Sequence, residues 1–361
     1  MNIYVLCPDH NRPSGGVRKL YRHVDVLTEH GWPASILHHR PGFCCTWFDH
    51  QTRIQYMPDV ALTPSDYLVV SEVYGPVIHD IQPGVPKVIF NQGCYLTFHG
   101  YSLEKKDDDP PYLHPDVKAV LVVSEDSRAY LSHVFPGLWI HRLRYGIEPS
   151  LFRYEAQKKR QIAFMPRRNR EAVRQVINAL NYGGVLQGFD LAAIDDRDER
   201  ETADMLRESL LFLSFSEAEG FGLPPAEAMA CGCVVVGYHG MGGREFFLPQ
   251  HCFPVPQGDI MAMVRTVERV AGMAIDSPET LAAYGQRAAR FCGGVLFSRA
   301  RRERHRALLD NDSRWREWPL EAHRITVPRV HTLLRCVEQR RMPRVRSADS
   351  RSTTLRSRSV L

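Results

Sequence analysis

Short apolar runs alternate with amphipathic helical stretches along most of this chain, and this alternation restricts the fold more than any other feature. Residues 3–7 form an apolar run that ends in a loop containing Pro and Gly. Apolar residues then recur at helical spacing from Val17 to Leu27, as in an amphipathic helix. Because strands that alternate with helices form parallel sheets, we expect strands at 34–37, 67–71, 87–91, 117–124 and 139–144, with helical stretches after Gly75 and Ser124.

A second alternation begins after the polar run at 155–161, so the chain divides into two halves. Strands are expected at 162–165, 185–189, 210–215 and 234–238, and helices at 170–181, 202–209 and 223–230, with three more after Asp259. A chain of 361 residues exceeds the usual size of a single core. We therefore predict an α/β fold with two Rossmann-like domains at 1–154 and 155–296, and helices at 297–338 that pack back on the first domain.

Positive charge is concentrated at the end of the chain. From Arg299 onward there are 17 Arg, no Lys and 7 acidic residues. Residues 339–361 are a basic Arg/Ser tail, a composition typical of disorder. An anionic membrane surface suits such a tail, whereas nucleic acid does not, because no aromatic residues interleave the late arginines. Apolar runs too short to span a bilayer, and an N-terminus unlike a signal peptide, predict a cytoplasmic protein, peripheral at the inner membrane face.

The stretch at 214–232 carries the most chemical information. A predicted buried strand ends in a loop with two glycines, and Pro224 and Pro225 open the following helix, as Pro does at helix starts. Free backbone amides at such a helix start attract anions and polar oxygens, and ligands bind at this edge of open parallel sheets. Glu219 lies in the loop and Glu227 in what we interpret as the first helical turn. A carboxylate can accept two hydroxyl hydrogen bonds, which suits the vicinal diol of a ribose or hexose.

This stretch resembles the paired-glutamate signature of the retaining GT-B glycosyltransferases of family 4, in which two glutamates are separated by seven residues. The resemblance includes Val123-Ser124-Glu125, Tyr145-Gly146-Ile147 and Gly242-Gly243-Arg244-Glu245, and it covers residues 1–309. It implies two domains facing each other across a cleft, and transfer of a hexosyl group with retention from a nucleotide-diphosphate sugar. It further implies that Glu227 binds the ribose, while Glu219 and the loop Gly220, Phe221, Gly222 and Leu223 hold the donor sugar, with Gly243 nearby.

The departing diphosphate requires positive charge, and arginine forks bind phosphate oxygens bidentately. Arg168 and Arg167 follow the first strand of the second half, where the resembled family uses an Arg and a Lys. We expect these two to act and Arg170 and Arg174 to be solvated. Backbone amides of Gly15 and Gly16 would face the same phosphates. We interpret the acidic run at 107–109 as a solvated turn, so neither a metal nor a cofactor is expected, and the nucleotide-sugar would be the donor substrate.

The acceptor side is less defined by the sequence. The resembled family places a histidine after a middle strand of the first domain, where this chain has Asn91 and Gln92 instead. These two, and His10 in a neighbouring loop, are the acceptor-side candidates, and the acceptor would be a glycan or glycolipid of polysaccharide biosynthesis. Two alternatives stay open: a non-catalytic nucleotide-sugar-binding protein and a sugar-nucleotide epimerase of the same architecture. A dinucleotide oxidoreductase is disfavoured, because the three-glycine fingerprint is missing after the first strand.

Overall fold

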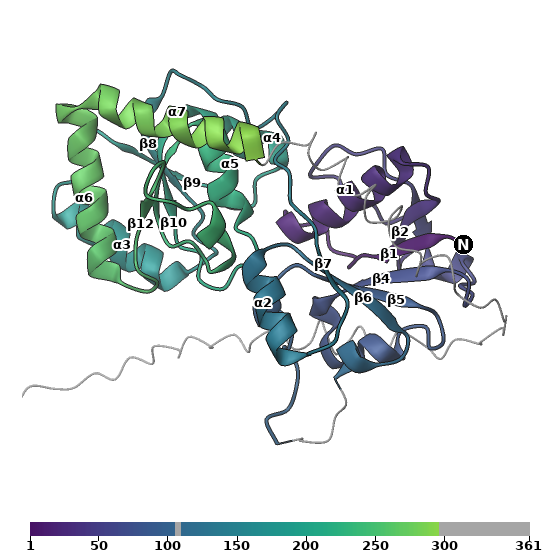
Figure 1. The fold of residues 1–361 in the computed structure, drawn as a ribbon. Helices are drawn as coiled ribbons and strands as arrows, with labels where there is room; N and C mark the ends of the chain where they lie inside the picture. Colours follow the sequence, from purple (N-terminus) through teal and green to yellow (C-terminus); the bar gives the residue numbers. More distant parts are fainter. Residues whose placement is uncertain (105–109, 296–361) are drawn as a thin grey trace, which may run out of the picture. The chain divides into compact units, whose positions relative to one another are not determined.

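The computed structural model describes residues 1–104 and 110–295, and the first part of this range builds a parallel sheet of seven strands. Its spatial order is β3-β2-β1-β4-β5-β6-β7 (Figure 1). Helices α1 (Gly15–Glu29) and α2 (Glu125–Val134) accompany this sheet. The strands are β1 (Ile3–Leu6), β2 (Ala34–His38), β3 (Ile54–Tyr56), β4 (Tyr67–Ser71), β5 (Lys87–Asn91), β6 (Val117–Val122) and β7 (Ile140–Arg142).

The second half builds a separate parallel sheet of five strands, in the order β12-β11-β10-β8-β9. Its strands are β8 (Lys159–Phe164), β9 (Asp190–Ala193), β10 (Ser209–Ser214), β11 (Val234–Gly237) and β12 (Phe253–Pro254). Its helices are α3 (Arg170–Tyr182), α4 (Glu199–Glu208), α5 (Leu223–Cys231), α6 (Ile260–Asp276) and α7 (Pro278–Val295). The predicted α/β class with two parallel sheets is confirmed.

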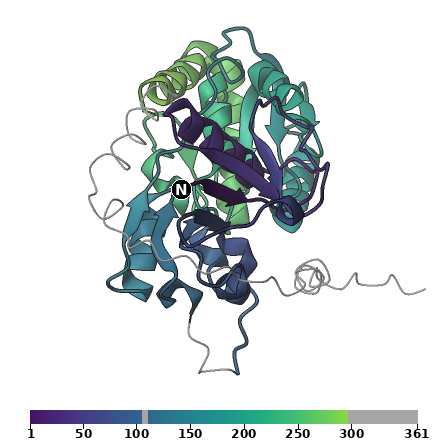
Figure 2. The same ribbon diagram turned by 90° about the vertical axis from the view of Figure 1, so that its right-hand side faces the viewer.

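Alternation of side chains along the strands gives the second sheet two apolar faces. Leu211 and Leu213 of β10 face the core formed with α3 and α6, whereas Phe212 between them faces the core shared with α4, α5 and α7. Successive side chains of a strand point to opposite faces, and a parallel sheet covered on both faces reads as a continuous apolar run. Figures 1 and 2 show the helices on either side of the sheets.

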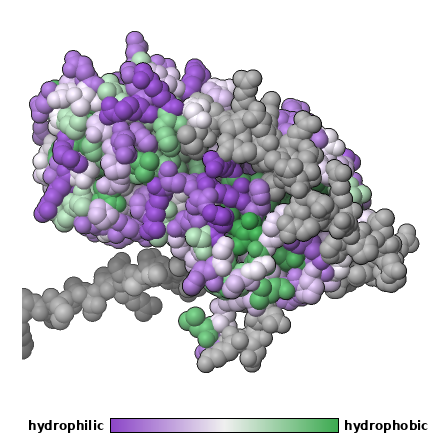
Figure 3. All heavy atoms as spheres, in the orientation of Figure 1, coloured by the Kyte–Doolittle hydropathy of each residue, from purple (hydrophilic) through white to green (hydrophobic). Residues whose placement is uncertain are grey.

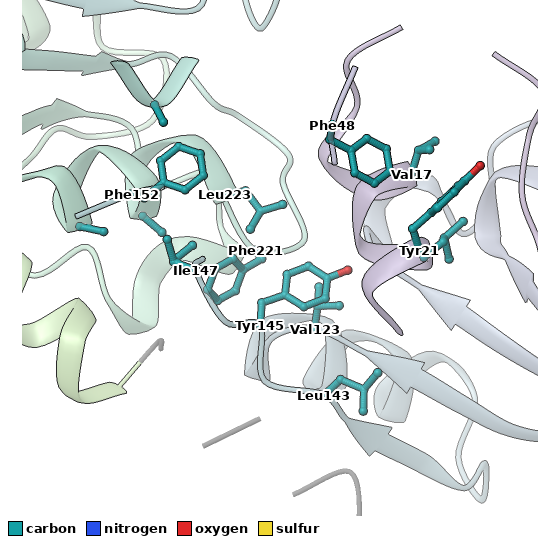
Figure 4. Packing of buried hydrophobic residues seen from close by; sticks show 14 of the residues in the cluster. Val17, Tyr21, Phe48, Val123, Leu143, Tyr145, Ile147, Phe152, Phe221 and Leu223 are labelled. Atoms are coloured by element: carbon teal, nitrogen blue, oxygen red, sulfur yellow. The ribbon is translucent and has the colours of Figure 1, made fainter. Parts of the chain in front are cut away.

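One apolar cluster extends from the first sheet into the second half of the chain. Tyr145, Phe152, Phe221 and Leu223 belong to the same cluster as the core residues of β1 and α1, and Figure 4 shows them between the ribbons of the two halves. The rings of Tyr145 and Phe221 meet edge to face with centroids 5.5 Å apart. The two sheets accordingly belong to one compact unit.

One expected strand is absent from the second sheet. The strand predicted at 185–189 is a series of turns, and the strand of this region is β9, four residues long. Leu186 and Phe189 are buried. The apolar run there packs in the same core as α3 and does not pair in the sheet. The helical stretch expected after Gly75 is present, as part of a 3-10 helix, Glu72–Asp80, that is kinked at Gly75, where φ is 55°.

Other expectations fall outside the described residues or lack a test. The short strands β3 and β12 were not predicted, because three and two residues are too few to show a period. Helices α6 and α7 follow Asp259 as expected. The third helix, the helices expected at 297–338 and the basic tail at 339–361 lie outside the described residues, and the domain limits stay predictions.

The helices present polar faces outward. Figure 3 shows mainly hydrophilic residues, with scattered hydrophobic ones, over the elements of the second sheet. α3 buries one apolar stripe and exposes most of its other residues, as amphipathic surface helices do. Within residues 1–104 and 110–295, no helix combines the length and the apolar character that crossing a membrane requires.

Candidate active site at the edge of the second sheet

The carboxyl ends of β8, β10 and β11 place the predicted donor-binding residues at one sheet edge. Arg167 and Arg168 follow β8, and the loop with Glu219 and Gly220 follows β10. The loop after β11 supports that second loop, because Glu219 N–H donates to Gly240 O at 2.9 Å and Gly242 N–H donates to Glu219 O at 3.1 Å. Carboxyl ends of parallel strands are where open α/β sheets bind ligands.

Glu219 and Arg168 form an ion pair in this structure. The Arg168 guanidinium nitrogen lies 2.5 Å from Glu219 Oε1, and the two side chains remain 32% and 19% exposed. Arg167 donates to Pro13 O of the first half at 2.8 Å. Burial lowers the pKa of Arg167, and the neighbouring charge of Arg168 lowers it further. Two guanidinium groups at one sheet edge thus form a site that an anion would stabilise.

Helix α5 begins at Leu223, and the residue before it has a backbone conformation that favours glycine. Gly222 is the N-cap with φ 89°, in the left-handed region that favours glycine. Because the helix starts at Leu223 and has no acidic residue in its first turn, the expected position of Glu227 in that turn is wrong. Glu227 lies in the second turn of α5, where the helix macrodipole stabilises a carboxylate only weakly.

Glu227 is buried and bound to an arginine of the first half. Arg18 of α1 donates to Glu227 Oε1 through one nitrogen and to Glu199 Oε1, at 2.7 Å, through another. The three residues are 7%, 4% and 5% exposed. The two carboxylates raise the pKa of the Arg18 guanidinium, while burial raises the pKa of Glu227 against the opposing charge of Arg18.

A small cavity of about 50 Å³ collects several predicted residues. The start of α1 forms one wall, and its cap residue Ser14 makes no side-chain hydrogen bond to the helix. Amides at an uncapped helix start are available to an anion. The lining includes Gly15, Arg167, Arg168, Leu223 and Glu227.

The two halves also touch directly at Gly220. A Cβ atom built on Gly220 would lie 1.8 Å from Gln92 O and 2.9 Å from Gly93 Cα, so only glycine permits this approach. The Gln92 side chain is held from both ends: its Nε2 donates to Gly16 O at 3.2 Å, and its Oε1 accepts from Tyr145. Gln92, Gly16 and Gly220 therefore meet at one point between the sheets.

Three predicted residues lie elsewhere. Asn91 is fully buried and donates to Thr97 Oγ1 at 3.0 Å and to Tyr112 at 2.8 Å, so its amide is used within the first half. His10 is half-buried in the loop after β1. Gly243 is buried beside the ring of Phe246, one loop away from the cavity.

The remaining sequence predictions concern two further arginines, the acidic run and a metal site. Arg170 and Arg174 are exposed on α3, as expected. The acidic run at 107–109 lies outside the described residues. In the described ranges, no group of three His, Cys, Asp or Glu side chains is placed to hold a metal ion.

Two participants, Arg18 and Glu199, were missed by the sequence analysis. Asp198 caps α4 through Glu201 N–H, and the Glu201 side chain returns to the Asp198 N–H. This capping box is a readable signal. It moves the helix start from the expected residue 202 back to Glu199, which places that carboxylate at the sheet edge. Nothing in the local pattern around Arg18 distinguishes it from other helical arginines.

Comparisons with known proteins identify what this chain is similar to. Residues 194–290 match the family model described as glycosyl transferases group 1. An alpha-1,6-glucosyltransferase of Actinobacillus pleuropneumoniae serotype 7 is 27% identical over 242 residues, which are 64% of this chain and 71% of that protein.

Solved structures show the same fold at low identity. Sucrose-phosphate synthase from Thermosynechococcus elongatus aligns with a TM-score of 0.62 and 14% identity over 85% of this chain and 98% of its own. Anabaena HepE in complex with UDP aligns with a TM-score of 0.61 and 13% identity over 86% and 100%. The chain is therefore a glycosyltransferase that carries a group 1 domain and has the GT-B fold.

Proposed function

We propose that this enzyme transfers a hexosyl group, with retention and without a metal, from a nucleotide-diphosphate sugar to a glycan or glycolipid acceptor. The observation that carries the proposal is the cavity between the halves, where Arg167, Arg168, Gly15 and Glu227 converge. Catalysis would consist of stabilising the leaving diphosphate and positioning the reactants in a closed cleft.

The diphosphate would lie between the arginine pair and two helix starts. Arg168 would exchange Glu219 for phosphate oxygens, because a guanidinium binds phosphate and carboxylate through the same fork. The amides at Gly15 and Leu223 would add partial positive charge from the ends of α1 and α5. No proton transfer to the leaving group is needed if this charge is sufficient.

The donor sugar and the ribose would bind to the two glutamates. Glu219, released from Arg168, would accept hydroxyl hydrogen bonds of the sugar, and Glu227 those of the ribose. The acceptor would enter from the first half, where Gln92 faces Gly220. Asn91 and His10 are not retained in this role, since the first is used inside the core and the second lies in a separate loop.

The names of similar proteins support a choice of donor to test first. One relative is an alpha-1,6-glucosyltransferase, and HepE was solved with UDP-glucose. UDP-glucose is therefore the first donor to test, followed by GDP- and dTDP-sugars.

A binding and product screen tests the proposal. Purified enzyme would be melted with each sugar nucleotide, with and without EDTA, since a ligand that binds the native state stabilises it by RT ln(1 + [L]/Kd). We expect one donor to raise the Tm equally under both conditions. Glu227→Gln should abolish the rise, while Glu268→Gln, on the exposed face of α6, should keep it.

Product analysis separates the alternatives. Transfer yields a larger glycan whose new linkage keeps the anomeric configuration of the donor. An isomer of the donor would indicate an epimerase, and an inverted linkage would refute retention. Loss of turnover with EDTA, restored by a divalent cation, would refute metal independence.

We also propose a cytoplasmic location with peripheral contact at the inner membrane face. The support is the excess of 17 Arg over 7 acidic residues after Arg299, since each basic residue near an anionic surface contributes about 1 kcal/mol. Co-sedimentation with anionic vesicles should fall with added salt and on deletion of residues 339–361. Equal binding to neutral vesicles would contradict this idea.

A further inference from the structure

Arg18 joins the two halves at the place where the nucleotide is proposed to bind. It comes from α1 of the first half, and both of its carboxylate partners, Glu199 and Glu227, come from helices of the second half. Its guanidinium is also 5.8 Å from the ring of Phe152, which lies in the segment that connects the halves. The pairing is therefore a link between domains and not a local feature of α1.

The neighbouring residue anchors the connecting segment itself. Lys19 donates to Gly146 O at 2.5 Å and lies 5.0 Å above the ring of Tyr145. Consecutive residues of α1 thus hold the second half and the segment that leads to it. Any change in the angle between the halves must move α1 relative to these partners.

The two cavities that Arg18 and Glu227 line are each too small for a nucleotide. The cavity that Arg18 and Glu227 line measures about 50 Å³, and a second one lined by both residues measures about 30 Å³. Sites for small-molecule ligands typically measure about 300–1,000 Å³. A donor that reaches Glu227 must enlarge these cavities, and separation of the halves does so by breaking the bonds of Arg18 to Glu199 and Glu227.

We propose that Arg18 is a positioning residue that occupies the Glu227 carboxylate in the donor-free enzyme and yields it to the donor when the halves open. This inference rests on the proposed function, because it takes Glu227 as a donor-binding group. When the halves close over the bound donor, Arg18 pairs with Glu199 again, while Glu227 stays with the donor. Donor binding and domain closure are coupled through one side chain.

The physical reason is the cost of unpaired buried charge. With Arg18 removed, the closed form would bury Glu227 without its ion-pair partner and leave Glu199 with the more distant Arg22, 3.9 Å away, an arrangement that is unfavourable. The open form exposes both carboxylates to water and avoids that cost. Removing Arg18 should therefore raise the open, binding-competent fraction, and the apparent Kd equals the intrinsic Kd divided by that fraction.

The test compares Arg18→Gln with wild type and with Arg174→Gln, a change at an exposed helix position. Titration calorimetry would measure UDP binding, small-angle scattering the radius of gyration without ligand, and initial rates kcat and KM. We expect Arg18→Gln to bind UDP up to about tenfold tighter, if the closed form holds about 90% of donor-free wild type. It should have a larger radius of gyration and a lower kcat, because the closed form is lost. Arg174→Gln should match wild type.

Glu199→Gln provides a second variant in case Arg18→Gln fails to fold. It removes one partner of Arg18 and leaves Glu227 in place, so UDP should again bind more tightly, by a smaller factor. UDP binding that is unchanged or weaker in folded variants would overturn the proposal.

Failure of the proposed function gives a different result. If wild type binds none of the UDP, GDP and dTDP sugars, the donor assignment is refuted, and scattering alone decides the role of Arg18. A radius of gyration unchanged by Arg18→Gln then overturns the inference, and an increase supports Arg18 as the link that holds the halves closed.

Discussion

Gly220→Ala tests directly whether the close contact between the halves matters for catalysis. The added Cβ would lie 1.8 Å from Gln92 O, whereas real Cβ contacts stay above about 3.0 Å. The loops must therefore separate by about 1.2 Å, the difference between these two distances. Backbone conformation offers no obstacle, because φ of Gly220 is outside the left-handed region.

The size of the effect follows from this displacement. Adding a methyl group to a packed contact costs about 1–3 kcal/mol, and a misplacement of about 1 Å can reduce a rate about 100-fold. We expect kcat to fall by about that factor. Donor affinity should increase, because the wider separation favours the open form that admits the donor.

The assay is initial-rate kinetics of sugar transfer, combined with UDP titration and thermal melting. Gly272→Ala is the matched control, since a Cβ there meets no described atom within 4 Å and Ala is favoured over Gly in the middle of a helix by about 1 kcal/mol. A folded Gly220→Ala enzyme with wild-type kcat would refute the reasoning, because the halves would then need no such approach.

Three further predictions concern charge, pH and a buried hydroxyl. Arg168→Gln should lower kcat about 100- to 1,000-fold by removing a donor to the diphosphate, while the exposed Arg174→Gln keeps it; initial rates at saturating donor check both, and equal losses would contradict the assignment. Burial raises the pKa of Glu72 from 4.5 to about 7, so its native form favours the proton. Its contribution to the free energy of unfolding, up to about 3 kcal/mol, is present below pH 4.5 and is lost as the pH rises through 7. Glu72→Gln should remove this dependence, as urea midpoints at pH 5 and pH 8 would show. The same change in midpoint between the two pH values in both proteins would exclude Glu72 as its source. Tyr21→Phe loses the hydrogen bond of the buried hydroxyl to His38 Nε2, 2.7 Å long, and should lower the free energy of unfolding by about 1–3 kcal/mol without changing UDP affinity, which calorimetry can verify.

Much of the architecture was predictable because it depends on local patterns. Strand β4, at Tyr67–Ser71, was expected at the observed limits, since its residues are buried on both faces and read as one apolar run. The strand expected at 185–189 shows the weakness of this signal. Leu186 and Phe189 are as buried as strand residues, but they pack from turns, and burial alone does not distinguish the two.

The glycines and prolines around the site were informative for a related reason. Gly222 requires a left-handed backbone, and the prolines after it open α5, so these residue types report the local conformation directly. Which of Asn91 and Gln92 reaches the contact between the halves was not readable in the same way. Asn91 and Gln92 are adjacent in sequence, but the Asn91 side chain donates within the first core, whereas the Gln92 side chain donates to Gly16 O and its backbone carbonyl lies against Gly220.

The sequence by itself determined the two parallel sheets, the loops at their carboxyl edges and the presence of Glu219 and two arginines in those loops. Only the tertiary structure decided which charges meet. Arg18 is separated from Glu199 and Glu227 by 181 and 209 residues, and no periodicity or capping signal extends so far. Electrostatic interaction depends on distance and burial in the folded chain, and both are properties of how the two halves pack, not of any segment alone.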